Sequence, residues 1–138
     1  MKKLILPLLL LVALLSGCSN ADDENYIDLT ALSSTVVFAE VYNMMTTPDL
    51  YMGKTVKMSG LYYASYYDVT DQFYHYVIVA DAVACCQQGI EFIWLGDHPY
   101  PESYPADESE VELEGIFSSY NELDATYYYI AVEDIRVL

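Results

Sequence analysis

The feature that most constrains the fold is an alternation of side chains over residues 55–67. Apolar or small side chains, among them Val56, Met58 and Tyr62, occupy every second position, and mostly polar or tyrosine side chains lie between them. A period of two predicts a β-strand with one buried face. Gly60 lies in the middle of that face, where a strand of a small barrel must bulge or coil sharply. We therefore predict a long first strand that bends at Gly60.

Four further segments have the composition of strands. They are predicted at residues 73–80, 90–95, 109–120 and 126–132, and the last continues over 135–138. Residues 90–95 are apolar on both faces, and residues 109–120 alternate glutamates with Val111, Leu113 and Phe117. Residues 97–107 contain three prolines, which predicts an extended loop. Residues 36–45 repeat with the helical period, so we expect one amphipathic helix that ends before Pro48.

These elements predict a mainly β fold, a five-stranded Greek-key barrel of the OB type preceded by one helix. The segment G-K-T-V-K-M-S-G at residues 53–60, after a turn containing Pro48 and Tyr51, resembles the OB-like extracytoplasmic domains of small bacterial proteins, the tRNA-anti-like group. The resemblance covers residues 36–138 and implies a fold rather than an activity. Because the proline-rich loop replaces the helix that OB-folds carry between their third and fourth strands, a small open β-sandwich is the alternative.

The first residues have the pattern of a secretory signal. Two lysines precede an apolar run at residues 4–15, which is too short to span the roughly 30 Å hydrocarbon core of a bilayer. Leu15-Ser16-Gly17-Cys18 resembles the lipobox of bacterial lipoproteins, which implies cleavage before Cys18 and diacylglyceryl (palmitate-type) modification of its thiol. We therefore expect a signal peptide at 1–17, an acidic tether at 18–30 and a domain at 31–138. The resemblance places the domain on the extracytoplasmic face of the cell membrane, held by lipid.

The charge balance restricts the partners. The chain has 21 acidic and 5 basic residues, a formal net charge of −16, and loss of Lys2 and Lys3 with the signal makes it more negative. Such a surface repels phosphate backbones, so nucleic acid is not expected as a partner. It suits solubility, cations or a basic partner.

No sequence motif for a catalytic nucleophile, a metalloprotease or a phosphate-binding loop is present, so we predict a protein that is not an enzyme. We expect a binding or accessory lipoprotein of the cell envelope whose ligand, a peptide, a glycan or another envelope protein, lies across tyrosines of adjacent strands. The candidate ligand-binding residues are Tyr62, Tyr66, Tyr74 and Tyr76. The alternative is that these tyrosines only form half-exposed strand faces, for which tyrosine is well suited.

The adjacent cysteines Cys85 and Cys86 support a second hypothesis, a metal- or thiol-handling envelope protein. Two thiolates bind zinc or copper(I), with His75 or Asp81 as a candidate third ligand. Outside the cytoplasm the thiols could instead form a strained disulfide between adjacent residues. A third interpretation is that one cysteine packs as a small apolar side chain and the other has no role.

Overall fold

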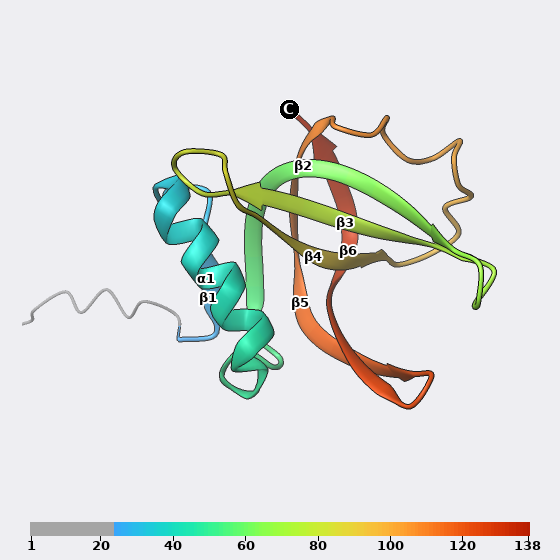
Figure 1. Ribbon diagram of the computed structural model, residues 1–138, viewed down its shortest axis with the longest axis horizontal. Coiled ribbons are helices and arrows are strands. Elements are labelled where there is room, and N and C mark those ends of the chain that lie inside the picture. The colour runs from blue at the N-terminus through green and yellow to red at the C-terminus, as the bar shows by residue number, and fades with distance from the viewer. Residues whose placement is uncertain (1–23) are drawn as a thin grey trace, which may run out of the picture.

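The computed structural model describes residues 24–138, and Figure 1 shows its arrangement. Its elements are β1 (Tyr26–Asp28), α1 (Ser34–Thr46), a 3-10 turn η1 (Pro48–Leu50), β2 (Thr55–Tyr67), β3 (Gln72–Ala80), β4 (Gln87–Trp94), β5 (Glu110–Glu122) and β6 (Ala125–Val137). The predicted signal peptide at 1–17 and the predicted lipidation site Cys18 lie outside the described residues. Within residues 24–138, no helix is long and apolar enough to cross a membrane.

Five of the strands form a ring of hydrogen-bonded pairs. They follow one another in the order β2-β3-β4-β6-β5, and β5 pairs again with β2. β4 and β6 run parallel, whereas the other neighbours in the ring are antiparallel. β6 lies between β4 and β5 in the ring, although it follows β5 in the chain. This order is the Greek-key connection of the OB-like barrel. The prediction of a mainly β, OB-like domain with one helix is therefore confirmed.

The sheet has six strands, not the predicted five, and it is not a clean barrel. The added strand β1 pairs in parallel with the start of β2, Tyr26 opposite Thr55 and Asp28 opposite Lys57. β2 pairs with β3 only from Leu61 onward, which leaves one edge of its first residues open to β1. β1 belongs to the segment that we predicted as tether, and three residues are too few to show a strand period. The ordered domain therefore begins before residue 31.

Gly60 lies where β2 changes partners. Up to Leu61, β2 pairs with β5, and from Leu61 it pairs with β3, so the strand bends between two sides of the ring. The φ of Gly60 is not positive. A Cβ atom there would instead lie 2.5 Å from the Ile78 carbonyl oxygen of β3. The glycine is required because β3 approaches the bent strand too closely for any side chain.

The core fills the interior of the ring. The alternation predicted for β2 is confirmed, because Val56, Met58 and Tyr62 are all buried. Phe92 and Phe117 are the other large aromatic core residues. α1 packs against β3 and β4 and buries Val41 and Met44, which confirms the predicted amphipathic helix. The ends of two long hairpins, β2–β3 and β5–β6, project from the ring (Figure 1).

Candidate functional site: an acidic aromatic groove and a thiol cluster

The β2–β3 and β5–β6 hairpins extend beyond the ring (Figure 1). Residues of both hairpins and of β4 line a groove. Two adjoining clefts of about 390 and 200 Å³ share four lining residues, Tyr74, Glu91, Tyr120 and Glu122. We call the two clefts together the hairpin groove. Its other lining residues are Ser65, Tyr67, Gln72, Phe73, His75, Tyr76, Phe92, Ile93, Trp94, Tyr104 and Tyr127.

Glu91 is the most unusual residue of this groove. It is 8% exposed and is the one charged side chain that is buried among the described residues. The Tyr120 hydroxyl donates to its carboxyl oxygens at 3.0 and 3.2 Å. Burial raises the pKa of Glu91 to about 7, helped by the nearby negative charge of Glu122 and opposed by the Tyr120 hydrogen bond. The groove therefore holds a carboxyl group that changes charge near neutral pH.

A second carboxyl group lies beside the first. The Tyr74 hydroxyl donates to Glu122 at 2.7 Å and is also bonded to Thr70 at 2.8 Å. Burial raises the pKa of Tyr74, and burial together with the charge of Glu91 raises the pKa of Tyr76. These hydroxyls consequently stay protonated. The Tyr74 hydroxyl donates to one of the two carboxyl groups, and the Tyr76 hydroxyl lies near both of them.

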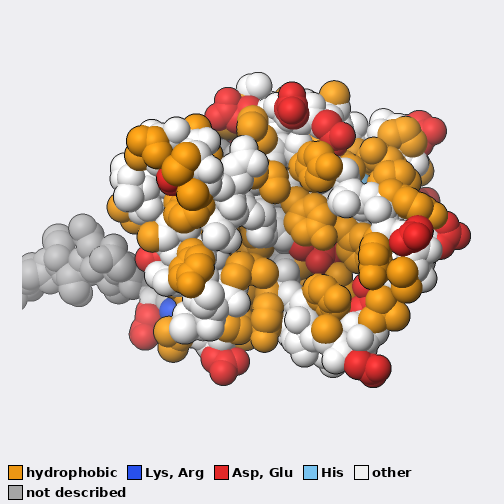
Figure 2. Space-filling model, in the orientation of Figure 1, with side chains coloured by type: hydrophobic (Ala, Val, Ile, Leu, Met, Phe, Trp, Pro, Cys, Tyr) orange, Lys and Arg blue, Asp and Glu red, His pale blue; other side chains and the backbone are white. Residues whose placement is uncertain are grey.

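The groove is lined by hydrophobic and acidic side chains without lysine or arginine. On the face shown in Figure 2, hydrophobic side chains gather in the middle and acidic ones lie among and around them. The described part of the chain has three lysines and arginines, Lys54, Lys57 and Arg136, and the last two form ion pairs with Glu112 at 3.7 and 2.8 Å. No lysine or arginine within residues 24–138 lines the groove, and the one histidine that lines it, His75, is neutral at physiological pH.

His75 belongs to an aromatic stack between the core and the proline-rich loop. Its ring stacks on Tyr104 at a centroid distance of 3.9 Å, and its Nδ1 shares a hydrogen bond of 2.8 Å with the Tyr62 hydroxyl. Burial lowers the pKa of His75 to about 4, so the ring is neutral at physiological pH. The cysteines belong to a different cluster, which consists of Asp81, Cys85 and Cys86 and does not include His75.

The four tyrosines predicted as one ligand face lie on two faces. In the β2–β3 register, Tyr66 lies opposite Phe73 and Tyr62 opposite Val77, whereas Tyr74 and Tyr76 belong to the intervening positions. Tyr62 is 1% exposed and part of the core. Tyr66 is exposed and donates to Asp71 at 2.6 Å. Of the four, the structure brings Tyr74 and Tyr76 into the hairpin groove.

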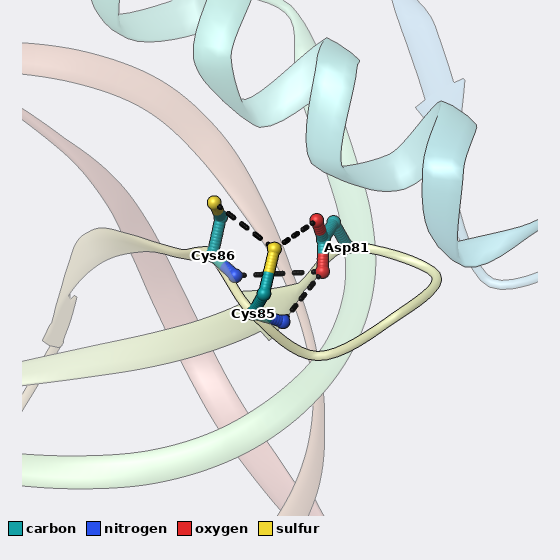
Figure 3. A group of neighbouring side chains, drawn as sticks. All are labelled: Asp81, Cys85 and Cys86. Carbon is teal, nitrogen blue, oxygen red and sulfur yellow. Dashed lines mark hydrogen bonds between the residues drawn. The ribbon is translucent and has the colours of Figure 1, made fainter.

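The cysteines lie on the loop between β3 and β4, together with Asp81 (Figure 3). Both are free and exposed, with their sulfur atoms 3.5 Å apart. The Cys85 thiol donates to Asp81 Oδ2 at 3.2 Å, and this hydrogen bond raises the pKa of the Cys85 thiol. One donor atom from each of the three residues lies within 4.8 Å of the others.

Glu91, Tyr120 and Glu122 line the groove but were not predicted from the sequence as site residues. We described residues 90–95 as apolar on both faces, although Glu91 interrupts that run. A single carboxyl group in an apolar strand was the available signal, because a charge is rarely buried without a reason. Tyr120 and Glu122 carried no such signal. They reach the groove only because the β5–β6 hairpin curves back toward β4.

A scan against protein-family models and a search of curated proteins give no match to this sequence. Among solved structures, the chain is similar to the N-terminal domain of the PriB protein from Thermoanaerobacter tencongensis, with 17% identity over 61% of this chain and 94% of that one, and a TM-score of 0.42. It is also similar to OBody NL8, solved bound to hen egg-white lysozyme, with 17% identity over 62% of this chain and 94% of that one, and a TM-score of 0.36. The OB-like assignment depends on the strand order and pairing given above.

Proposed function

We propose that the protein is a lipid-anchored, extracytoplasmic binding module of the cell envelope, without enzymatic activity, that holds an extended peptide segment of another envelope protein in the hairpin groove. The segment carries a basic side chain. The observation that carries this proposal is Glu91, a buried carboxyl group at the centre of an aromatic groove. The relation to the tRNA-anti-like group is part of the proposal and adds nothing about the ligand.

Three properties support a cationic ligand. Aromatic faces attract cations through their quadrupoles, and Tyr74, Tyr76 and Tyr120 supply such faces beside two carboxyl groups. A buried Glu91 without a positive partner is unfavourable when ionised, so an ammonium or guanidinium group would supply the missing countercharge. The negative charge of the whole chain steers cations toward the surface. A neutral sugar would use the rings but would leave Glu91 uncompensated.

Trp94 gives a direct test, because it lines the groove and is the single tryptophan of the chain. We expect a peptide of alternating lysine and glycine to change the tryptophan fluorescence, and the same peptide acetylated on its lysines to bind at least tenfold more weakly. Glu91→Gln should weaken binding of the lysine peptide about tenfold or more, since a charge-assisted contact contributes roughly 1.5–3 kcal/mol.

Glu24→Gln is the matched control, because it removes one negative charge from an exposed position outside the groove. It should leave the affinity within about twofold of the wild type, after screening by 0.15 M salt. Equal loss in both variants would mean that the peptide responds only to net charge. Stronger binding of a neutral chitooligosaccharide than of the lysine peptide would replace the proposed ligand class by a glycan.

The anchor is tested separately. We expect mass spectrometry of the membrane-extracted protein to show Cys18 as the N-terminal residue with a diacylglyceryl group, because two acyl chains hold a protein stably on a bilayer. Cys18→Ser should leave an unprocessed precursor without lipid. Cleavage at another bond, with no lipid attached, would contradict the anchor and leave the groove proposal intact.

A further inference from the structure

We propose that Asp81, Cys85 and Cys86 form a zinc-binding site on the β3–β4 loop, separate from the hairpin groove. The ligands are the two cysteine sulfur atoms and Oδ2 of Asp81. Two thiolates and one carboxylate suit zinc, which accepts sulfur and oxygen ligands together, better than copper(I), which prefers sulfur alone. The inference goes beyond the binding function proposed for the groove, and either proposal can fail without the other.

Two of the three distances between the donors are close to those of a zinc site. In a tetrahedral site with zinc–sulfur bonds of about 2.3 Å, two sulfur ligands lie about 3.8 Å apart. The Cys85 and Cys86 sulfur atoms are 3.5 Å apart. A sulfur and a carboxylate oxygen lie about 3.6 Å apart in such a site, and Cys85 Sγ and Asp81 Oδ2 are separated by 3.2 Å. These two distances differ from the tetrahedral values by a few tenths of an ångström, and the third, between Cys86 and Asp81, is at most 4.8 Å and closes when the ion binds.

This proximity is unusual because consecutive side chains of an extended chain point to opposite sides. Here the backbone of the loop turns both thiols to the same side, as Figure 3 shows. Ala84, directly before them, has a positive φ of 55°, and its N–H donates to the Asp81 carbonyl at 3.0 Å. The Asp81 N–H in turn donates to the Cys86 carbonyl at 3.0 Å, which closes the loop.

The two carboxyl oxygens of Asp81 have different roles. Oδ1 accepts hydrogen bonds from the backbone N–H groups of Cys85 at 3.0 Å and Cys86 at 3.4 Å, and so fixes the loop. Oδ2 faces the Cys85 sulfur and is available to the ion. The loop is thus held by one oxygen while the other completes a set of three ligands. Because both cysteines are exposed, water or a partner side chain can occupy the fourth tetrahedral position.

The test uses the full-length chain in a Cys18→Ser background, so that Cys85 and Cys86 are the only thiols. The protein is reduced with a phosphine, freed of metal and titrated with Zn²⁺ against a chromophoric chelator, and with Co²⁺ as a spectroscopic probe. We expect one ion per chain, and a sulfur-to-cobalt charge-transfer band whose intensity about halves when one cysteine is replaced by serine.

The variants separate the ligands. Cys85→Ser/Cys86→Ser should lower the zinc affinity at least 100-fold. Asp81→Asn keeps an oxygen for the backbone N–H groups but loses the negative charge, so it should lower the affinity about tenfold with an unchanged thermal unfolding midpoint of the metal-free chain. His75→Gln should bind zinc like the wild type. Retained binding in the double cysteine variant, or no binding of one ion per chain in the parent, would overturn the site, and an Asp81→Asn variant with wild-type affinity would overturn the three-ligand geometry.

Discussion

Replacing Tyr62 with alanine is expected to lower the free energy of unfolding by about 3–5 kcal/mol, the range for removing a large aromatic side chain from a core. Tyr62 is 1% exposed, and its ring packs against Tyr104, Phe92 and His75 at centroid distances of about 6 Å. Its loss would leave a cavity where the core meets the proline-rich loop. Denaturant unfolding followed by circular dichroism at pH 7 measures the change. The expected loss is a large fraction of the total free energy of unfolding of an ordinary domain, about 5–15 kcal/mol.

Tyr62→Phe is the matched variant, because it keeps the ring and removes only the hydroxyl that is bonded to His75 Nδ1. We expect a loss of about 1 kcal/mol, the usual net contribution of one such hydrogen bond. Tyr62→Phe should not alter the affinity of the hairpin groove for the lysine peptide, because it keeps the ring that packs against His75, Phe92 and Tyr104. A Tyr62→Ala loss below about 1 kcal/mol would show that the side chain is not part of a packed core.

The sequence predicted the fold well where one side-chain pattern decided the outcome. The period of two in β2 identified both its bounds and its buried face, because a strand with one face against a core must alternate. Gly60 was correctly predicted as the point where β2 bends, but the reason why only glycine fits there was not predicted. The close approach of the β3 backbone, rather than the backbone angle of the glycine, is the constraint, and that approach exists only in the folded chain.

The candidate site depended on information that a single strand does not carry. Tyr62 and Tyr76 lie on different faces because of the register between β2 and β3, which hairpin geometry sets. Tyr120 meets Glu91 through the curvature of a hairpin formed by later residues. The cysteine cluster was the reverse case. Its three residues are close in sequence, so the sequence alone could predict that they lie near one another. That His75 does not belong to the cluster could be seen only in the structure.

Glu91 connects the stability of the domain to its proposed function. Natural proteins commonly keep a group that opposes folding where a ligand needs it. Glu91 interrupts the apolar side chains of β4, and no lysine or arginine among the described residues lines the groove around it. In the free protein, the buried Glu91 carboxylate lowers the stability of the fold. When a basic side chain of a partner binds, its positive charge offsets this loss.

This cost predicts a specific pH dependence. The folded chain holds the Glu91 proton more tightly than the unfolded chain, because burial raises the pKa from 4.5 to about 7. The contribution of this proton to stability is therefore complete below about pH 4.5 and is lost as the pH rises through about 7. The full pKa difference corresponds to about 3 kcal/mol, and solvent in the open groove reduces it to about 2 kcal/mol.

Glu91→Gln should remove this pH dependence. Its amide oxygen still accepts from Tyr120, so at pH 4 the variant and the wild type should unfold with free energies that differ by less than about 0.5 kcal/mol. At pH 8 the variant should be more stable by about 2 kcal/mol, while its affinity for the lysine peptide is lower. Unfolding in urea at a series of pH values between 4 and 8 measures the difference between the two chains, in which the titrations of the other carboxyl groups cancel. A difference that stays constant across this range would show that Glu91 ionises as readily in the folded chain as in the unfolded one. That result would contradict the proposal that the hairpin groove binds a cationic side chain.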